Sequence, residues 1–146
     1  MVKNILVALD GSEHSKKAVE FAIDSAKMCG ATLYLIHVWE EKNQPKGFEE
    51  HVHEQKLPYN YFDEVCHRDH FVGDAEARAK EAGIKSVEII CANGDPAEEI
   101  LRTAKEVTAD LIVMGNRGLG KFPRVLMGSV STKVCNHSNS TCVIVK

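Results

Sequence analysis

Short apolar runs alternate with segments of helical periodicity along this chain of 146 residues. The run at residues 5–9 (ILVAL) is continuous and apolar, which is typical of a strand buried on both faces of a parallel sheet. Four more runs, at residues 32–38, 86–92, 111–114 and 141–145, predict four further strands. Because helical segments separate the runs, the pattern predicts an α/β fold, a single-domain open parallel five-stranded sheet with helices on both faces.

The helical segments have recognisable ends. Ser12 predicts the N-cap of a first helix, and Gly30 is a typical C-terminal stop. Asp95 predicts the cap of a later helix, with Pro96 in its first turn and Glu98 reaching back to the cap. Two more helices are predicted, one from about residue 57 to residue 83 and one over residues 129–136. Residues 40–56 form a polar stretch that predicts a lid, a partner surface or a partly disordered loop.

Composition excludes several classes of protein. The formal net charge is −3, which provides no general basic field for nucleic acid. The apolar runs are far shorter than the roughly 20 residues that span a membrane, and the amino terminus has no pattern of a secretory signal, so we expect a cytoplasmic protein. Five cysteines without a CxxC pair argue against a zinc ribbon or a redox site, and we expect free thiols rather than a disulfide framework.

Glycines and small polar residues follow two of the predicted strands. Open α/β sheets bind ligands beyond the carboxyl ends of their strands, where Asp10-Gly11-Ser12 follows the first strand and Met114-Gly115-Asn116-Arg117-Gly118 follows the fourth. Glycines let a backbone approach a ligand closely. Farther along, Ser129 and Ser131 add hydroxyl groups at the start of the last predicted helix, whose amino end favours negative charge. Basic side chains lie between these segments: Arg117, Lys121 and Arg124. These features suit a polyphosphate.

Two common phosphate motifs do not fit this segment. The dinucleotide fingerprint GxGxxG is absent. The Walker A pattern matches at Gly115, Gly120 and Lys121, but Phe122 stands where a Ser or Thr should bind magnesium. Since a phenyl ring cannot coordinate a metal, a true P-loop is rejected.

A third pattern, G-x2-G-x9-G-[S/T], fits Gly115, Gly118, Gly128 and Ser129. The chain resembles the ATP-binding branch of the universal stress protein family over nearly its whole length. Besides this glycine pattern, the similar segments are residues 3–12 (KNILVALDGS), 35–38, 94–101, 110–118 and 128–134. The resemblance implies one nucleotide-binding domain over residues 1–146 with strand order 3-2-1-4-5. It also implies a role in stress response, bound ATP, ADP or AMP with Mg²⁺ or Mn²⁺, and a homodimer through Thr141–Val145.

The resemblance also implies roles for single residues. Asp10 would lie near the adenosine or its ribose, and Val38 would line the adenine pocket. Ribose and phosphates would be surrounded by Gly115, Gly118, Gly128 and Ser129, with Ser131 as a further phosphate contact. Asn116 stands where family members often carry Ser or Thr, which would alter a hydrogen bond near the ribose. The predicted binding residues are Asp10, Gly11, Ser12, Val38, Met114, Gly115, Asn116, Arg117, Gly118, Gly128, Ser129, Val130 and Ser131.

Three functions stay open at this point. The favoured hypothesis is a regulatory ATP-binding module, because no general base is aimed at the phosphate cradle. A slow ATP hydrolase or nucleotide-dependent transferase would need Asp10 or His37 to position water or an acceptor. A dimeric interaction protein would hold its nucleotide structurally. Cys66, His67 and His70 form a weak candidate for a metal site, with a solvated helix face as the alternative. No nucleic-acid or membrane partner is expected.

Overall fold

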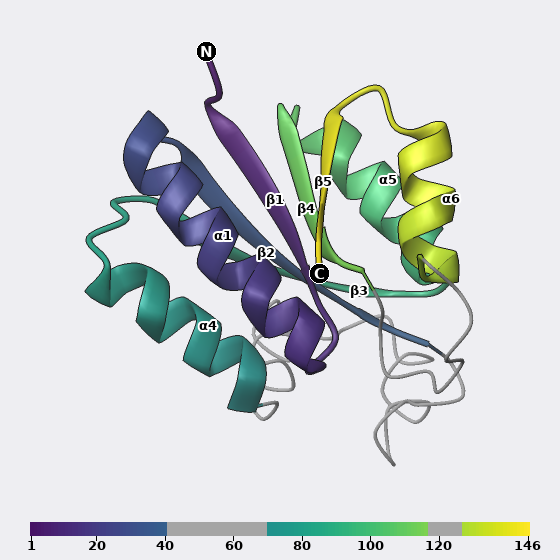
Figure 1. Ribbon diagram of the computed structural model, residues 1–146, viewed down its shortest axis with the longest axis horizontal. Coiled ribbons are helices and arrows are strands. Elements are labelled where there is room, and N and C mark those ends of the chain that lie inside the picture. The colour runs from purple at the N-terminus through teal and green to yellow at the C-terminus, as the bar shows by residue number, and fades with distance from the viewer. Residues whose placement is uncertain (41–69, 117–126) are drawn as a thin grey trace, which may run out of the picture.

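A computed structural model describes residues 1–40, 70–116 and 127–146, and its centre is a five-stranded parallel sheet (Figure 1). The strand order is β3-β2-β1-β4-β5, as the family resemblance implied. The strands are β1 (Asn4–Leu9), β2 (Thr32–Trp39), β3 (Val87–Asn93), β4 (Leu111–Gly115) and β5 (Thr141–Val145). The predicted strands are therefore confirmed to within one residue at either end.

Helices cover both faces of the sheet, as predicted. They are α1 (Glu13–Cys29), α4 (His70–Glu81), α5 (Pro96–Glu106) and α6 (Ser129–His137). Helices α1 and α4 lie on one face, and α5 and α6 lie on the other (Figure 1). The start of α4 lies at the edge of the described residues, so the predicted helix start near residue 57 and the polar loop at residues 40–56 fall largely outside them.

Strand β1 contributes to a hydrophobic core on each side of the sheet. Ile5 and Val7 pack with α1 and α4, whereas Leu6 packs with α5 and α6. All three side chains are fully buried. The continuous apolar run in the sequence thus reflects a strand without a solvent-facing side, which is characteristic of a covered parallel sheet.

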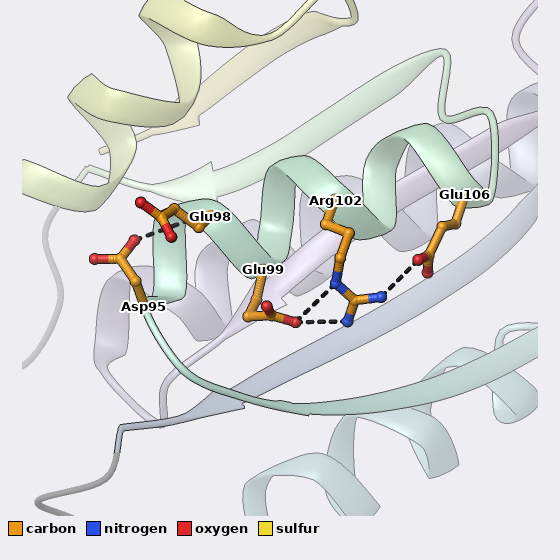
Figure 2. A network of polar contacts seen from close by, with 5 residues as sticks. All are labelled: Asp95, Glu98, Glu99, Arg102 and Glu106. Atoms are coloured by element: carbon orange, nitrogen blue, oxygen red, sulfur yellow. Dashed lines mark hydrogen bonds and ion pairs between the residues drawn. The ribbon is translucent and has the colours of Figure 1, made fainter.

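The predicted helix ends are confirmed by hydrogen bonds. The Ser12 hydroxyl accepts from the Ser15 backbone N–H at 3.1 Å, and Gly30 ends α1 in the left-handed region at φ +66°. Asp95 caps α5 by accepting from the Glu98 backbone N–H at 2.9 Å (Figure 2). The Glu98 side chain differs from its prediction, because its carboxylate accepts from Lys133 of α6 at 3.1 Å.

The cysteines differ in part from the expectation of free thiols. Cys29, Cys135 and Cys142 are free, whereas Cys91 in β3 is disulfide-bonded. Among the described helices, none is both long and apolar enough to cross a membrane.

Candidate functional site

The carboxyl ends of β1 and β4 lie side by side in the middle of the sheet. Strand β1 pairs with β2 on one side and with β4 on the other, so the strand order reverses between β1 and β4. The β1–α1 turn follows the first of these ends, and Gly115 and Asn116 lie at the second. This is the topological switch point at which open α/β sheets bind their ligands. The structure therefore brings the two predicted strand ends together.

The β1–α1 turn is held by its own polar groups. An Asp10 carboxylate oxygen accepts from the Ser12 backbone N–H at 2.9 Å. Gly11 has φ +80°, which an L side chain rarely adopts, and a Cβ there would lie 3.0 Å from the Phe71 ring. Ser12 is buried and uses its hydroxyl to cap α1. All three predicted binding residues in this turn, Asp10, Gly11 and Ser12, therefore also have a structural function.

Gly115 lets the first turn of α1 approach the end of β4. A Cβ on Gly115 would lie 2.7 Å from both the carbonyl carbon and the Cβ of His14. Non-bonded carbon atoms essentially never lie this close together, so a larger residue would push α1 and β4 apart. The requirement for glycine thus comes from packing between two elements of the site.

Asn116 links three elements through its backbone. Its N–H donates to the Val145 carbonyl of β5 at 2.7 Å, and its carbonyl accepts from the Gly128 N–H at 2.8 Å. Because Gly128 is the N-cap of α6, these two bonds place the amino end of α6 beside the ends of β4 and β5. The amino end of a helix favours anions through its unpaired N–H groups and its dipole.

The two predicted phosphate hydroxyls lie in different surroundings. Ser129 is exposed at the amino end of α6. Ser131 is buried, and its hydroxyl donates to the Gly128 carbonyl at 3.0 Å. Since that proton is already committed, Ser129 is better placed than Ser131 to donate a hydrogen bond to an anion.

Apolar side chains surround this edge of the sheet on the face of α5 and α6. Val38, at the carboxyl end of β2, and Ala8 of β1 are only partly buried, and both pack against the cluster that contains Met114. Val130 of α6 joins the same cluster. Ala8 was missed by sequence reasoning. It is a small residue near the carboxyl end of the central strand.

His37 faces the other side of the sheet. Its Nδ1 lies 2.8 Å from the Leu9 carbonyl, so this nitrogen carries the proton. The ring makes edge contacts with Trp39 and with Phe71 of α4, at centroid distances of 4.8 and 5.0 Å. His37 is thus hydrogen-bonded to the backbone of the neighbouring strand and half-buried.

Ion pairs hold α6 against α5. Lys133 of α6 lies 3.3 Å from Asp95 and 3.1 Å from Glu98 at the amino end of α5. The Glu98 backbone N–H and then Lys133 hold the pKa of Asp95 below its usual value, and hydrogen bonds to Glu98 and Asp95 raise the pKa of Lys133. On the outer face of α5, Arg102 joins Glu99 to Glu106 (Figure 2). The Lys133 ion pairs join α6 to α5, whereas those of Arg102 lie within α5.

Several predicted residues fall outside the described part of the chain. They are Arg117, Gly118, Lys121 and Arg124 of the glycine segment, and Cys66 and His67 of the candidate metal site. His70 is exposed at the start of α4. Within the described ranges, no group of three or more His, Cys, Asp or Glu side chains is arranged to hold a metal ion.

Comparisons with known proteins agree with the fold. The model of the universal stress protein family matches residues 1–146. Universal stress protein YxiE of Bacillus subtilis is 36% identical, and the alignment covers 100% of both chains. The solved structure of hypothetical protein MJ0577 has a TM-score of 0.81 at 29% identity and covers 100% of this chain and 96% of its own. A universal stress protein solved in complex with cAMP has a TM-score of 0.69 at 28% identity, covering 99% and 96%.

Proposed function

The chain belongs to the universal stress protein family, and we propose that it is an ATP-binding regulatory module that acts as a homodimer in stress response. In this proposal the nucleotide lies at the carboxyl edge of β1 and β4. One observation carries it: the Asn116 backbone joins the end of β4 to the amino end of α6, and the preceding Gly115 packs against His14 in the first turn of α1.

The surroundings of this edge suit the parts of an adenine nucleotide. The partly buried Ala8 and Val38 offer apolar contacts for a base, and the buried Met114 packs in the same cluster. The amino end of α6, with Gly128 and the exposed Ser129, suits phosphates. The solved relative in complex with cAMP supports an adenine nucleotide as the ligand class. Arg117 and Gly118, which complete the glycine motif, remain proposed contacts.

A divalent ion is part of the proposal. Mg²⁺ is usually held by phosphate oxygens and water with only one or two carboxylates, so it needs no cluster of acidic side chains. Asp10 is a carboxylate at this edge of the sheet. We therefore propose that Mg²⁺ or Mn²⁺ accompanies the phosphates and that Asp10 lies near the nucleotide.

The described side chains suit nucleotide binding without rapid hydrolysis better than they suit catalysis of ATP hydrolysis. The hydrolase alternative requires Asp10 or His37 to position water. His37 uses Nδ1 on the Leu9 carbonyl and contacts Phe71 on the α4 side of the sheet, whereas Val38 packs on the α5 side. Asp10 uses one oxygen to hold the turn before α1.

Isothermal titration with ATP, ADP and AMP, each with and without Mg²⁺, tests the proposal. The wild-type protein should bind at least one of these nucleotides at one site per chain. Ala8→Leu fills the apolar surface proposed for the base and should weaken binding at least about tenfold. Ala77→Leu, on the exposed face of α4, is the matched control and should bind like the wild type. Folded wild-type protein that gives no binding heat with any of the three would refute the proposal.

A further inference from the structure

Two of the free cysteines lie next to each other in the fold. Cys135 is in the last turn of α6, and Cys142 is the second residue of β5. Both side chains are partly buried, and both pack against the apolar cluster on the α5 and α6 side of the sheet. A hydrogen bond joins the two thiols. Cys29, the other free cysteine of the described residues, is exposed at the end of α1.

The connection between α6 and β5 holds the two thiols in this arrangement. Only residues 138–140 separate the two elements. The Ser138 N–H donates to the Val134 carbonyl at 2.9 Å, and the Ser140 N–H donates to the Ser138 hydroxyl at 2.9 Å. The Cys142 thiol donates to the Ser140 carbonyl at 3.7 Å. The backbone on both sides of the pair is therefore fixed by hydrogen bonds.

The surroundings of the pair favour a disulfide over a bound metal ion. A metal ion takes thiolates as ligands, and burial disfavours a charged sulfur. Burial, and then the neighbouring Cys142, raises the pKa of Cys135 to about 11. Within the described ranges, no third His, Cys, Asp or Glu side chain joins the pair to hold a metal ion. A disulfide is neutral, as two thiols are, so burial does not oppose its formation.

We propose that Cys135 and Cys142 are an oxidation site, at which exchange with a low-molecular-weight disulfide forms an internal disulfide between α6 and β5. The Cys142 thiolate attacks first, because the neighbouring Cys135 keeps its proton at neutral pH. A bond forms between the Cys142 sulfur and one sulfur of the small molecule. The bond within the small molecule breaks, and its other half leaves as a thiolate.

The second step closes the internal bond. The mixed disulfide on Cys142 is neutral, so the negative charge that disfavoured a thiolate at Cys135 is gone. Cys135 then loses its proton to water and attacks the Cys142 sulfur, which releases the second small thiolate. Two protein thiols and one small disulfide are thus converted into one protein disulfide and two small thiols. The protein is oxidised and the small disulfide is reduced.

Mass spectrometry of one tryptic peptide tests the proposal. No Lys or Arg lies between Lys133 and Lys146, so the peptide of residues 134–146 carries both cysteines. The full chain is equilibrated with oxidised and reduced glutathione, quenched with acid, alkylated with N-ethylmaleimide and digested. The wild-type peptide should be unalkylated and lighter than the dithiol by two hydrogen atoms. The equilibrium constant for this bond should be at least about tenfold larger in the folded chain than in the chain unfolded in urea, because the fold holds the thiols together.

Single variants of the full chain test the order of the two steps. Cys135→Ser should stop at the mixed disulfide, with one glutathione on Cys142. Cys142→Ser should leave Cys135 largely as a free thiol that N-ethylmaleimide alkylates under unfolding conditions. Cys29→Ser removes an exposed thiol elsewhere and is the matched control, so it should form the internal bond like the wild type.

Other results overturn the proposal. Two alkylated cysteines in the folded wild type, under conditions in which the unfolded chain forms the bond, would show that the fold prevents the disulfide. A wild-type peptide that carries glutathione on both cysteines would show that the second step does not occur. A glutathione adduct that forms on Cys135 in Cys142→Ser as fast as on Cys142 in Cys135→Ser would overturn the order of attack. If circular dichroism shows a serine variant to be unfolded, the alanine variant takes its place with the same expected result.

Discussion

Gly115 affects both the packing of the fold and the geometry of the candidate site. The sequence predicted a glycine here for close approach of a ligand. The structure adds a second reason, close approach of α1, because a Cβ at this position would collide with His14. That contact joins residues from the two halves of the chain, so no local pattern could reveal it. Ser12 and Asp95, in contrast, were predicted correctly, since a helix cap depends on residues three positions away.

We expect Gly115→Ala to lower the free energy of unfolding by about 1–3 kcal/mol, the usual cost of overpacking. The collision is with the His14 backbone, which cannot rotate away. Urea unfolding measures the change. Gly73→Ala is the matched control, because Gly73 lies in α4 with nothing within 4 Å of its Cβ position. The control should raise stability by about 0.5–1 kcal/mol. Equal midpoints for Gly115→Ala and the wild type would contradict the packing role.

At the scale of elements, hydrogen bonds outside the regular pairing of the β-sheet connect strands to each other and to the helices that follow them. Asp110, just before β4, accepts from the backbone N–H groups of Lys3 and Asn4 at 2.7 and 3.0 Å. This clamp joins the starts of β1 and β4 at the edge opposite the site. The strands were predicted from apolar runs, but this cross-connection was not, because the two segments are distant in sequence.

The clamp predicts a pH dependence of stability. Hydrogen bonds from the Lys3 and then the Asn4 backbone N–H hold the pKa of Asp110 below its usual value. A carboxylate whose pKa is lowered on folding stabilises the protein above its unfolded pKa, about 3.9, and loses that contribution as the pH falls through its folded pKa. Asp110→Asn should therefore be less stable than the wild type at pH 7, and the difference should shrink below pH 4.

Urea midpoints at pH 7, 5 and 3 measure this difference. Asp24→Asn, at an exposed position of α1, controls for the loss of one negative charge and should change the midpoints little. A deficit of Asp110→Asn that stays the same from pH 7 to pH 3 would show that the ionised carboxylate is not what stabilises the clamp.

For the whole molecule, the edges of the sheet decide how it can assemble. Among the described strands, β5 pairs only with β4, so its other side is an edge. The Thr141 N–H donates to the Asp110 carbonyl, and the Val145 carbonyl accepts from the Asn116 N–H. The backbone N–H and C=O groups of the odd-numbered residues of β5 therefore point toward β4. By alternation, the backbone groups of Cys142 and Ile144 point outward. A free edge of this kind favours pairing with a second strand.

Ile144→Pro removes one outward N–H and leaves the inward bonds to β4 in place. We expect light scattering to give the wild type about twice the chain mass of 16.2 kDa and the variant about one chain mass. Ile144→Val, which keeps the N–H, should remain dimeric. A wild-type monomer, or a proline variant that stays dimeric with native circular dichroism, would contradict assembly through β5.

Much of the architecture could be predicted from residue patterns, whereas the order of the strands could not. Apolar runs and helix caps locate elements, but they do not say which strand lies beside which. Here only the resemblance to a family implied the order 3-2-1-4-5, and the structure confirms it. The same limit explains why Ala8 and the linking role of Asn116 were missed. Both depend on neighbours from other strands.

In the proposed function, an adenine nucleotide binds where β1, β4 and α6 meet. Backbone amide spectra of ¹⁵N-labelled protein, recorded during titration with ATP and Mg²⁺, test it most directly. The expected shifts are in Gly11, Ser12, Val38, Asn116 and Ser129, with Asn4 and Asp110 at the opposite edge unchanged. Saturating ATP that leaves the spectrum unchanged, or that shifts mainly the opposite edge, would contradict the claim.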